Sequence, residues 1–311
     1  MQSDTDADIP SIKCELGNII TATSNNITIF QGYIFDRQKL STSSIINLTC
    51  YDKGIYLKRN QGTYKFKNET PEGIATRICK DFGISIGEIA ATGIKISRNF
   101  IGVNLYNIIQ TAYTLASEKN GKKYITYFAG GKLMIREKKL NKSTLVIKSG
   151  FNLMSTSTSE SISNMINQIT IYNEKDKLVK IQKDQSLINS YGLMQSYIKQ
   201  GKKEDATGKA KKLIEDNGLQ QKITIENLGN IGHITGNTVV IKESVTGVYG
   251  LFLIDNDIHT WKNGQYYNKL VIKFKNIMDE QTAGTLVDTT SNESSQNSSN
   301  WEYLFKPGGG E

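Results

Sequence analysis

Alternation of apolar and polar residues predicts β-strands in the first part of the chain. Residues 27–35 (Ile-Thr-Ile-Phe-Gln-Gly-Tyr-Ile-Phe) are apolar on both faces of an extended strand, as expected for a strand buried in a barrel or beneath a neighbouring subunit. Residues 45–51 alternate regularly, with Ile46, Leu48 and Cys50 on one inward face. The whole stretch from residue 12 to residue 57 is therefore predicted to be β structure.

Helical periodicity begins after residue 69. Thr70 is a natural N-cap, Pro71 suits the first helical turn, and Gly83 supplies a C-terminal stop. Apolar residues recur between them at helical spacing, at Ile74, Ile78 and Phe82. A second helix is predicted over 104–118, and a hairpin follows with strands at 124–128 and 133–137.

The second half of the chain mixes strands with a helical stretch. A Ser/Thr run at 155–163 is interpreted as a joint or loop, and a hairpin is predicted over 166–172 and 178–181. Two helices are then predicted, at 186–200 and 206–217. The strand pattern resumes in four segments, at 222–226, 237–243, 247–256 and 266–275.

The end of the chain is polar up to its last aromatic residues. Residues 281–300 are rich in Ser, Thr, Asn and Gln and nearly free of large apolar groups, which predicts a flexible tether. The apolar peptide that follows is interpreted either as a docking peptide for a partner or as a strap onto its own domain. Its candidate contact residues are Trp301, Tyr303, Leu304 and Phe305.

Length and pattern together predict an α+β, mainly β fold with several domains. A chain of 311 residues is long enough for two or three domains, each with its own core. The predicted division is a first β-barrel at 1–59, a small α+β domain at 60–145, a second β-barrel at 146–280 and the tether at 281–311. The second barrel carries a helical insertion at 184–218.

Two hairpin units in these predicted barrels share one pattern although they start 219 positions apart. Gly17-Asn-Ile-Ile-Thr-Ala corresponds to Gly236-Asn-Thr-Val-Val-Ile, and residues 30–36 then align without a gap with residues 249–255. Each unit is a Gly-Asn turn, a short apolar strand, a polar turn and a longer strand that closes on Asp. Only three of the twenty compared positions are identical, so convergent turn chemistry is an alternative to duplication. A duplicated unit would suit an assembly part in which one barrel is used twice.

The net charge of +8 points to solvated lysine faces more than to a nucleic-acid track. Only five of the 38 basic residues are arginine, the usual side chain for bidentate phosphate contacts. Lysines cluster at 119–123, 132–142 and 199–212, a pattern typical of solvated surface. A basic, OB-like nucleic-acid-binding protein is kept as an alternative, and contact with nucleic acid passing through a lumen is compatible with this charge.

Membrane insertion and export are not indicated. No apolar run approaches the roughly 20 residues that cross a bilayer. The N-terminus, Met-Gln-Ser-Asp-Thr-Asp-Ala-Asp, is acidic and polar, unlike a signal peptide. Synthesis and assembly in the cytoplasm are therefore expected.

Residues suited to catalysis or metal binding are sparse. Cys14, Cys50 and Cys79 have no CxxC spacing and lie in apolar patterns, so inert, reduced thiols are expected. His233 and His259 have no second His or Cys at ligand spacing. The Asp-Ile-His motif ending at His259 offers an oriented general base, but a strand-end histidine near a turn is the simpler interpretation. No nucleophile elbow, phosphate loop or dinucleotide fingerprint occurs, so no catalytic residue, cofactor or metal is assigned.

Several short stretches become specific when their order and spacing are taken together. They are Phe30-Gln-Gly-Tyr-Ile34, Cys50-Tyr-Asp-Lys-Gly-Ile-Tyr-Leu57, Lys80-Asp-Phe-Gly-Ile84, Tyr113-Thr-Leu-Ala-Ser-Glu-Lys119, Asp257-Ile-His-Thr-Trp-Lys-Asn-Gly264 and Phe274-Lys-Asn-Ile-Met-Asp-Glu280. In this arrangement, over about residues 10–280, the chain resembles the XkdQ/YqbQ-type baseplate hub proteins of PBSX-like prophages and phage-tail-like bacteriocins. In one respect it departs from them, since family members have an additional β segment before the stretch that begins here near Ile9. The first barrel is therefore expected to lack strands or to be completed by another chain.

The resemblance implies a fold and a structural role without enzymatic turnover; a tail-associated cell-wall hydrolase stays as the enzymatic alternative. It implies two similar β-barrels per subunit and a homotrimer, so that three subunits supply a six-part ring between a hexameric tail tube and a trimeric central spike. Other baseplate proteins are implied partners, and assembly in the bacterial cytoplasm is implied. Ring interfaces bury apolar strand faces. The candidate interface residues are Ile27, Ile29, Phe30, Tyr33, Tyr249 and Phe252.

Overall fold

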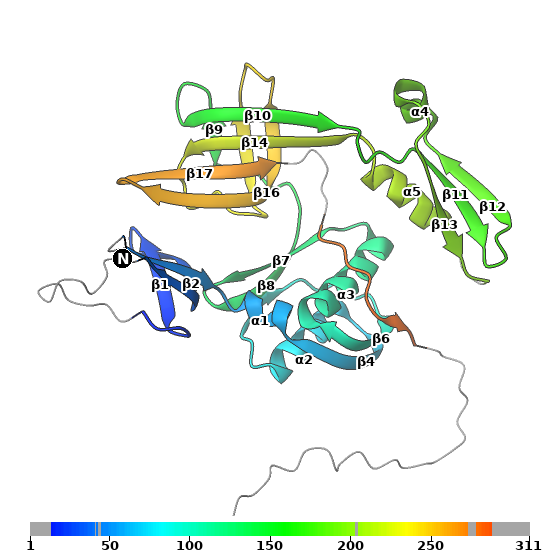
Figure 1. Ribbon diagram of the computed structural model, residues 1–311, viewed down its shortest axis with the longest axis horizontal. Helices are drawn as coiled ribbons and strands as arrows, with labels where there is room; N and C mark the ends of the chain where they lie inside the picture. The colour runs from blue at the N-terminus through cyan, green and yellow to red at the C-terminus, as the bar shows by residue number, and fades with distance from the viewer. Residues whose placement is uncertain (1–13, 41, 43–44, 203–204, 273–277, 288–311) are drawn as a thin grey trace, which may run out of the picture.

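The computed structural model of the protein is mainly β, as predicted. Over the residues that it describes, 14–40, 42, 45–202, 205–272 and 278–287, the strands form five sheets. Figure 1 shows a lower body that holds the first strands and a helix-bearing domain, a curved sheet above it, and a smaller unit that projects to one side of that sheet.

The described chain opens with a three-stranded antiparallel sheet. Its order is β1 (Ile19–Ser24), β2 (Ile27–Lys39) and β3 (Ile46–Tyr51). Asn25 and Asn26 form the two-residue turn between β1 and β2, with φ of 49° and 62°, a conformation that Asn tolerates better than most residues. The predicted inner face of β3 is confirmed, because Ile46 is buried and Leu48 and Cys50 are half-buried between exposed neighbours.

The small α+β domain is built around one long, almost completely buried helix. Its elements are α1 (Gly54–Arg59), β4 (Gln61–Glu69), α2 (Pro71–Asp81), β5 (Ile86–Ile89), β6 (Ile96–Asn104), α3 (Leu105–Asn120), β7 (Tyr124–Ala129) and β8 (Lys132–Glu137). The predicted cap is observed, since the Thr70 hydroxyl accepts the Gly73 N–H at 3.2 Å. The predicted hairpin is β7–β8. Because α1, α2, β6 and β7 all pack against α3, this helix has almost no solvent-facing side along its middle turns.

The second β region is a single six-stranded sheet that curls into a half-barrel (Figure 1). Its order is β10 (Leu153–Ser161), β14 (Gln220–Leu228), β17 (Gln265–Ile272), β16 (Tyr249–Lys262), β15 (Thr238–Lys242) and β9 (Val146–Lys148). The prediction of a loop at 155–163 is wrong, because β10 pairs along its length with β14. Thr and Ser are compatible with an extended strand whose one face is solvated, and no Gly or Pro interrupts the run.

The insertion within the second β region is less helical than predicted. β11 (Gln168–Asn173) and β12 (Leu178–Lys183) form the predicted hairpin, and α4 (Gln185–Tyr191) and α5 (Thr207–Asp216) are the helices. The predicted helix at 186–200 is wrong in its second half, because β13 (Gln195–Gln200) pairs in parallel with β11. Gly192 ends α4 at a φ of 81°, and Ser196 and Ile198 then alternate with exposed residues as in a strand.

Residues 278–287 return to the small domain, and we call them the return strap. The prediction of a flexible tether from residue 281 is wrong at its start. The Gln281 and Ala283 N–H groups donate to the Thr114 and Thr111 hydroxyls of α3, at 3.1 and 3.0 Å. β18 (Thr285–Leu286) then pairs with β6.

Two similar barrels are not confirmed. Within the described residues, the first β region is a sheet of three strands, and the second is a half-barrel of six. The two regions differ in the strands that flank their corresponding strands. In the second region β9, β14 and β10 extend the sheet on both sides, whereas no described strand extends β1 or β3 outward.

Candidate assembly interface

The two predicted hairpin units close with the same backbone hydrogen bonds. In the first, the Gly17 N–H donates to the Ile34 carbonyl at 2.8 Å and the Ile34 N–H donates to Asn18 at 3.0 Å. In the second, Gly236 donates to Ile254 at 2.9 Å and Ile254 donates to Asn237 at 2.9 Å. Both glycines have positive φ, 83° and 88°, which favours Gly at the turn.

The likeness extends through the long strand of each unit. The register between β2 and β3 shifts between Ile34 and Asp36, and that between β16 and β17 shifts between Ile254 and Asn256. A β-bulge thus follows directly after the residue that closes on the glycine in each unit. On the long strand, the alignment of residues 30–36 with 249–255 differs from the structure by one residue. Ile19 faces Tyr33, whereas its counterpart Thr238 faces Leu253. We call these sheets, β1–β2–β3 and β15–β16–β17, the two matched units.

The matched units differ strongly in burial. In the second, Thr238, Val239 and Ile241 of β15 are buried. In the first, β1 is exposed along most of its length, and Ile19 retains 64% of its accessible surface. The corresponding strands β15 and β1 thus differ, since β15 is covered and β1 is open. An open apolar strand is expected where a surface is covered on assembly.

The four interface candidates in the first matched unit fall into two groups. Ile27 is 51% exposed, and Ile29 is half-buried beside it. Tyr33 instead packs edge-on against Tyr56 of α1, with ring centroids 5.9 Å apart. The ring of Phe30 lies against Gly32, where a Cβ atom would overlap both that ring and the Tyr51 carbonyl. Tyr33 therefore joins the unit to α1, while Phe30 packs within the unit over Gly32. This packing accounts for Phe30, Gly32 and Tyr33 of the Phe-Gln-Gly-Tyr motif.

The two candidates in the second matched unit line a cavity beside β10. Tyr249 is 59% exposed at this cavity, and Phe252 is half-buried in it. The cavity has a volume of about 190 Å³ and lies between the ends of β10 and β14 on one side and the β15–β16 turn on the other. This volume is below the roughly 300 Å³ at which small-molecule sites begin, and it suits a side chain of a partner better than a cofactor.

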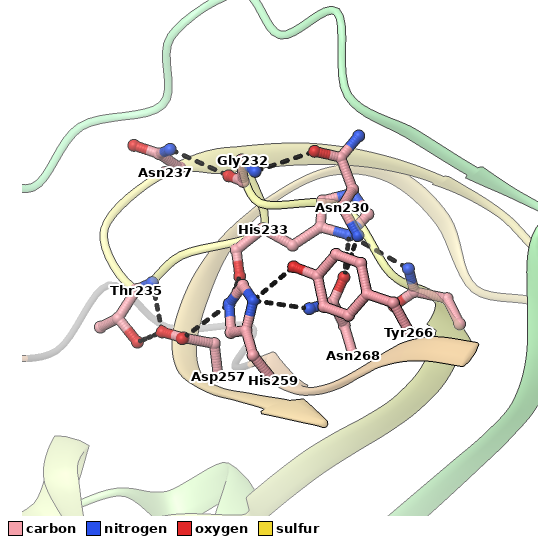
Figure 2. Close-up of polar contacts among 10 residues, drawn as sticks. Asn230, Gly232, His233, Thr235, Asn237, Asp257, His259, Tyr266 and Asn268 are labelled. Carbon is pink, nitrogen blue, oxygen red and sulfur yellow. Dashed lines mark hydrogen bonds and ion pairs between the residues drawn. The ribbon is translucent and has the colours of Figure 1, made fainter. Parts of the chain in front are cut away.

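The polar cluster in Figure 2 holds the loop that precedes Gly236 onto β16 and β17. His259 Nε2 lies 3.1 Å from Asp257 Oδ2 and 3.2 Å from the His233 carbonyl, while its Nδ1 lies 2.6 Å from the Tyr266 hydroxyl. Asp257 in turn accepts the Thr235 N–H at 2.6 Å. The Nε2 atom of His259 thus faces two acceptors, the Asp257 carboxylate and the His233 carbonyl, while its Nδ1 atom faces the Tyr266 hydroxyl.

His233 anchors the same loop from inside the sheet. Its side chain is 1% exposed, and its Nδ1 lies 3.1 Å from both Asn227 and Asn268. Burial lowers the pKa of His233, and nearby His259 acts in the same direction. Although burial acts to raise it, hydrogen bonds from His259 and Thr235 lower the pKa of Asp257. The cluster therefore holds a neutral imidazole and a charged carboxylate in fixed places.

This arrangement supports the structural interpretation of His259. An Asp-His-Tyr chain resembles the orienting part of a hydrolase site, but here each end is used for packing. Asp257 holds Thr235, and the Tyr266 ring stacks on Trp261 at 4.3 Å between centroids. In the described part of the chain, no group of three or more His, Cys, Asp or Glu residues is placed to hold a metal ion.

The cysteines are thiols without disulfide partners in the described residues. Cys14 and Cys79 are buried as expected, whereas Cys50 is half-buried. Burial raises the pKa of the Cys79 thiol to about 11. A thiol with such a pKa is a poor nucleophile near neutral pH.

The return strap contains a bridge that the sequence did not suggest. Glu280 pairs with Lys123, just before β7, at 2.8 Å through one oxygen and with Lys212 of α5 through the other. The Tyr106 hydroxyl donates to the neighbouring Asp279 at 2.6 Å. One strap thus joins the small domain to the insertion. The predicted contact residues Trp301, Tyr303, Leu304 and Phe305 lie outside the described residues, beyond the point where the strap ends on β6.

No helix in the described residues has the length and apolar character needed to span a bilayer.

Two solved structures share this fold over most of its length. The 43 kDa tail protein of prophage MuSo2 from Shewanella oneidensis matches with a TM-score of 0.66 at 16% identity, covering 88% of this chain and 87% of that protein. The tail protein from Neisseria meningitidis MC58 matches with a TM-score of 0.60 at 12% identity, covering 83% and 84%. The architecture is therefore a fold of phage tail proteins.

The chain belongs to the YQBQ-like family, whose model matches residues 1–273. The Phage-like element PBSX protein XkdQ of Bacillus subtilis (strain 168) is 28% identical over 263 residues, which is 81% of this chain and 80% of that relative. The uncharacterized protein YqbQ of the same strain is 26% identical over 260 residues, 80% of this chain and 78% of the relative. The resemblance inferred from the short motifs is thus confirmed.

Proposed function

We propose that this chain is a structural hub of the baseplate in a contractile phage tail or phage-like particle. Three copies would form a ring in which each copy supplies both matched units. Six similar positions would then face the hexameric tail tube, and the threefold symmetry would suit a trimeric central spike. Assembly in the bacterial cytoplasm and contact with other baseplate proteins belong to the same proposal.

The observation that carries this proposal is the pair of matched units. Identical glycine closure and identical bulge placement give one chain two units of similar backbone geometry, which a protein needs if three copies are to mimic sixfold symmetry. The names of the relatives support a tail role, since one is a phage-like element protein and the matched structures are tail proteins. A structural role without turnover agrees with the use of His259, Asp257 and Tyr266 in packing.

The proposed domain division follows the predicted one, with the first matched unit in 1–59, the small domain in 60–145 and the second β region with its insertion in 146–280. In this scheme the C-terminal residues Trp301, Tyr303, Leu304 and Phe305 dock a neighbouring baseplate protein. Ile27, Ile29 and Tyr249, at the open parts of the matched units, contribute to the ring.

The mass of the purified chain in solution tests the proposal. Light scattering over a concentration series should give three times the 34.7 kDa of one chain. The same measurement should be repeated after adding the trimeric spike protein encoded with the chain. A chain that stays monomeric alone and with the spike contradicts the trimeric hub.

A further inference from the structure

The second matched unit has a neighbouring strand that the first unit lacks. The outer edge of β15 carries β9 as a parallel neighbour, and the Val240 N–H donates to the Leu145 carbonyl at 2.9 Å. In the first unit β1 takes the place of β15, with Thr21 at the position of Val240. No described strand pairs with the outer edge of β1.

A second open edge lies on β10. This strand pairs with β14 along one side only, so its other side presents free backbone donors and acceptors over nine residues within the described chain. The cavity of about 190 Å³ lies at the ends of β10 and β14. Its lining includes Thr158, Ser159 and Glu160 of β10, Gln221, Lys222 and Ile223 of β14, and Val248, Tyr249 and Phe252 from the opposite wall. An added strand would find hydrogen bonds at β10 and, next to them, a recess with polar and apolar walls.

The composition of the two edges differs from that of the edges of the insertion sheet. Edge strands that must stay unpaired usually carry lysine or another charge. In the insertion sheet, β12 carries Lys180 and Lys183, and β13 carries Lys199. In contrast, β1 has no charged residue, and β10 has only Glu160 near its end. These two strands therefore lack the protection against pairing that β12 and β13 have.

The two edges are also complementary in their apolar groups. β1 brings Ile19, which is 64% exposed, and the start of β2 brings Ile27, which is 51% exposed. The recess beside β10 offers the apolar side chains of Val248, Tyr249 and Phe252. Figure 1 shows β1 and β10 on different bodies of the chain, so each copy offers one edge of each kind in separate places. Such a contact is head-to-tail, and a head-to-tail contact closes into a ring when the rotation per copy allows it.

We propose that β10 of one copy adds as a strand to the outer edge of β1 in the next copy, with Ile19 filling the recess beside β10. This inference rests on the proposed trimer and names its interface. It gives the first matched unit the outer neighbour that β9 provides in the second, and it covers the exposed face of β1.

Single lysines on the two strands test the pairing. Ser157 and Thr21 are exposed, so Ser157→Lys and Thr21→Lys should leave the folded chain intact, as judged by circular dichroism and melting temperature. Each should raise the dissociation constant of the trimer at least about tenfold, measured by light scattering over a dilution series. Asn164→Lys is the matched control, because this exposed residue follows β10 but lies outside it, and its trimer should dissociate as the wild type does.

A double variant with opposite charges on the two strands distinguishes this interface from other possible interfaces. Combining Ser157→Lys with Thr21→Glu should restore trimers that Ser157→Lys alone loses. If both single lysine variants remain trimers, or if the exchange restores nothing, the β1–β10 pairing is wrong while the trimeric hub stands. If Thr21→Lys lowers the melting temperature without changing the mass, β1 is covered within its own chain and the pairing is again wrong. A wild-type chain that is monomeric alone and with the spike overturns the trimeric hub and the pairing together.

Discussion

Gly229 and Tyr266 lock the end of β14 to the hairpin of β16 and β17. The Gly229 N–H donates to the Tyr266 carbonyl at 2.7 Å, and the Tyr266 ring lies so close to Gly229 that a Cβ atom there would overlap it. The hydroxyl of Tyr266 also contacts His259, so this one residue connects the end of β14, the β16–β17 hairpin and the polar cluster.

Gly229→Ala should therefore destabilise the half-barrel by about 1–3 kcal/mol, because the ring must move to admit the methyl group. Denaturant unfolding followed by the fluorescence of Trp261, which stacks on Tyr266, measures this. Gly208→Ala in α5 is the control, since a Cβ there meets no atom within 4 Å and Ala favours the helix. An equal loss of stability in both variants would contradict the explanation.

Glu280→Gln should loosen the return strap. The bridge to Lys123 and Lys212 is only 23–28% exposed, so losing the carboxylate charge should cost about 1–2 kcal/mol locally. Faster hydrogen exchange at the amides of Gln281 and Ala283 is the expected result. Glu88→Gln removes the exposed pair with Arg136 and should cost less than about 0.5 kcal/mol. Unchanged exchange in Glu280→Gln would show that the other contacts of the strap, with Thr111, Thr114, Tyr106 and β6, hold it without the bridge.

Mild acid should destabilise the half-barrel through His233. Its pKa is lowered from 6.5 in the folded state, so the unfolded chain binds a proton first as pH falls. The stabilising contribution is complete above the unfolded pKa of about 6.5 and is lost as pH falls from there toward the lowered folded pKa. Asp257, whose pKa is also lowered, loses its contribution only below about pH 4, so the two windows are separate.

The melting temperature measured from about pH 8 to about pH 5 checks this prediction. His233→Asn should melt lower than the wild type near neutral pH but should change less with pH. A His233→Asn variant with the same pH slope as the wild type would assign the acid sensitivity to another group.

Deletion of residues 296–311 should leave the fold and the trimer intact but weaken attachment to a neighbouring baseplate protein. The deletion begins beyond the return strap, so it removes none of the hydrogen bonds that fix residues 281–287. A pull-down from cells that assemble the particle measures the attachment. The triple variant Trp301→Ala, Tyr303→Ala, Phe305→Ala is the matched control that keeps the chain length. Unchanged recovery of baseplate proteins by both would end the docking role of this peptide.

Local patterns predicted α2 and α3 of the small domain well. Thr70, Pro71 and Gly83 act within a few residues of α2, so their effect on the backbone does not depend on distant contacts. The short helix α1 was not predicted, because most of it lies in the stretch 12–57 that was expected to be β structure. The strands that follow Gly17 and Gly236 were predicted correctly, since a glycine turn and an alternating strand are local features.

Other elements depended on their neighbours. β10 is a Ser/Thr run whose extended form is supported by pairing with β14, and the alternation in β13 is too weak to outweigh the helical pattern that precedes it. Gly192 is the local signal that ends α4. The lysine clusters and the motif that contain Lys123, Lys212 and Glu280 gave no sign that these residues pair, because they come from segments far apart in the chain.

The sequence by itself determined the mainly β class, α2, α3 and the hairpin of the small domain, the family resemblance and the matched pair of glycine turns. Each of these rests on residue types within a few positions of one another. The tertiary structure alone decided that the second unit is covered by β9, β14 and β10 while the described part of the first is open. It also decided that His233, His259 and Tyr266 form one cluster and that the strap returns to α3. Those features arise from packing between distant segments, where burial and hydrogen-bond partners depend on the whole fold.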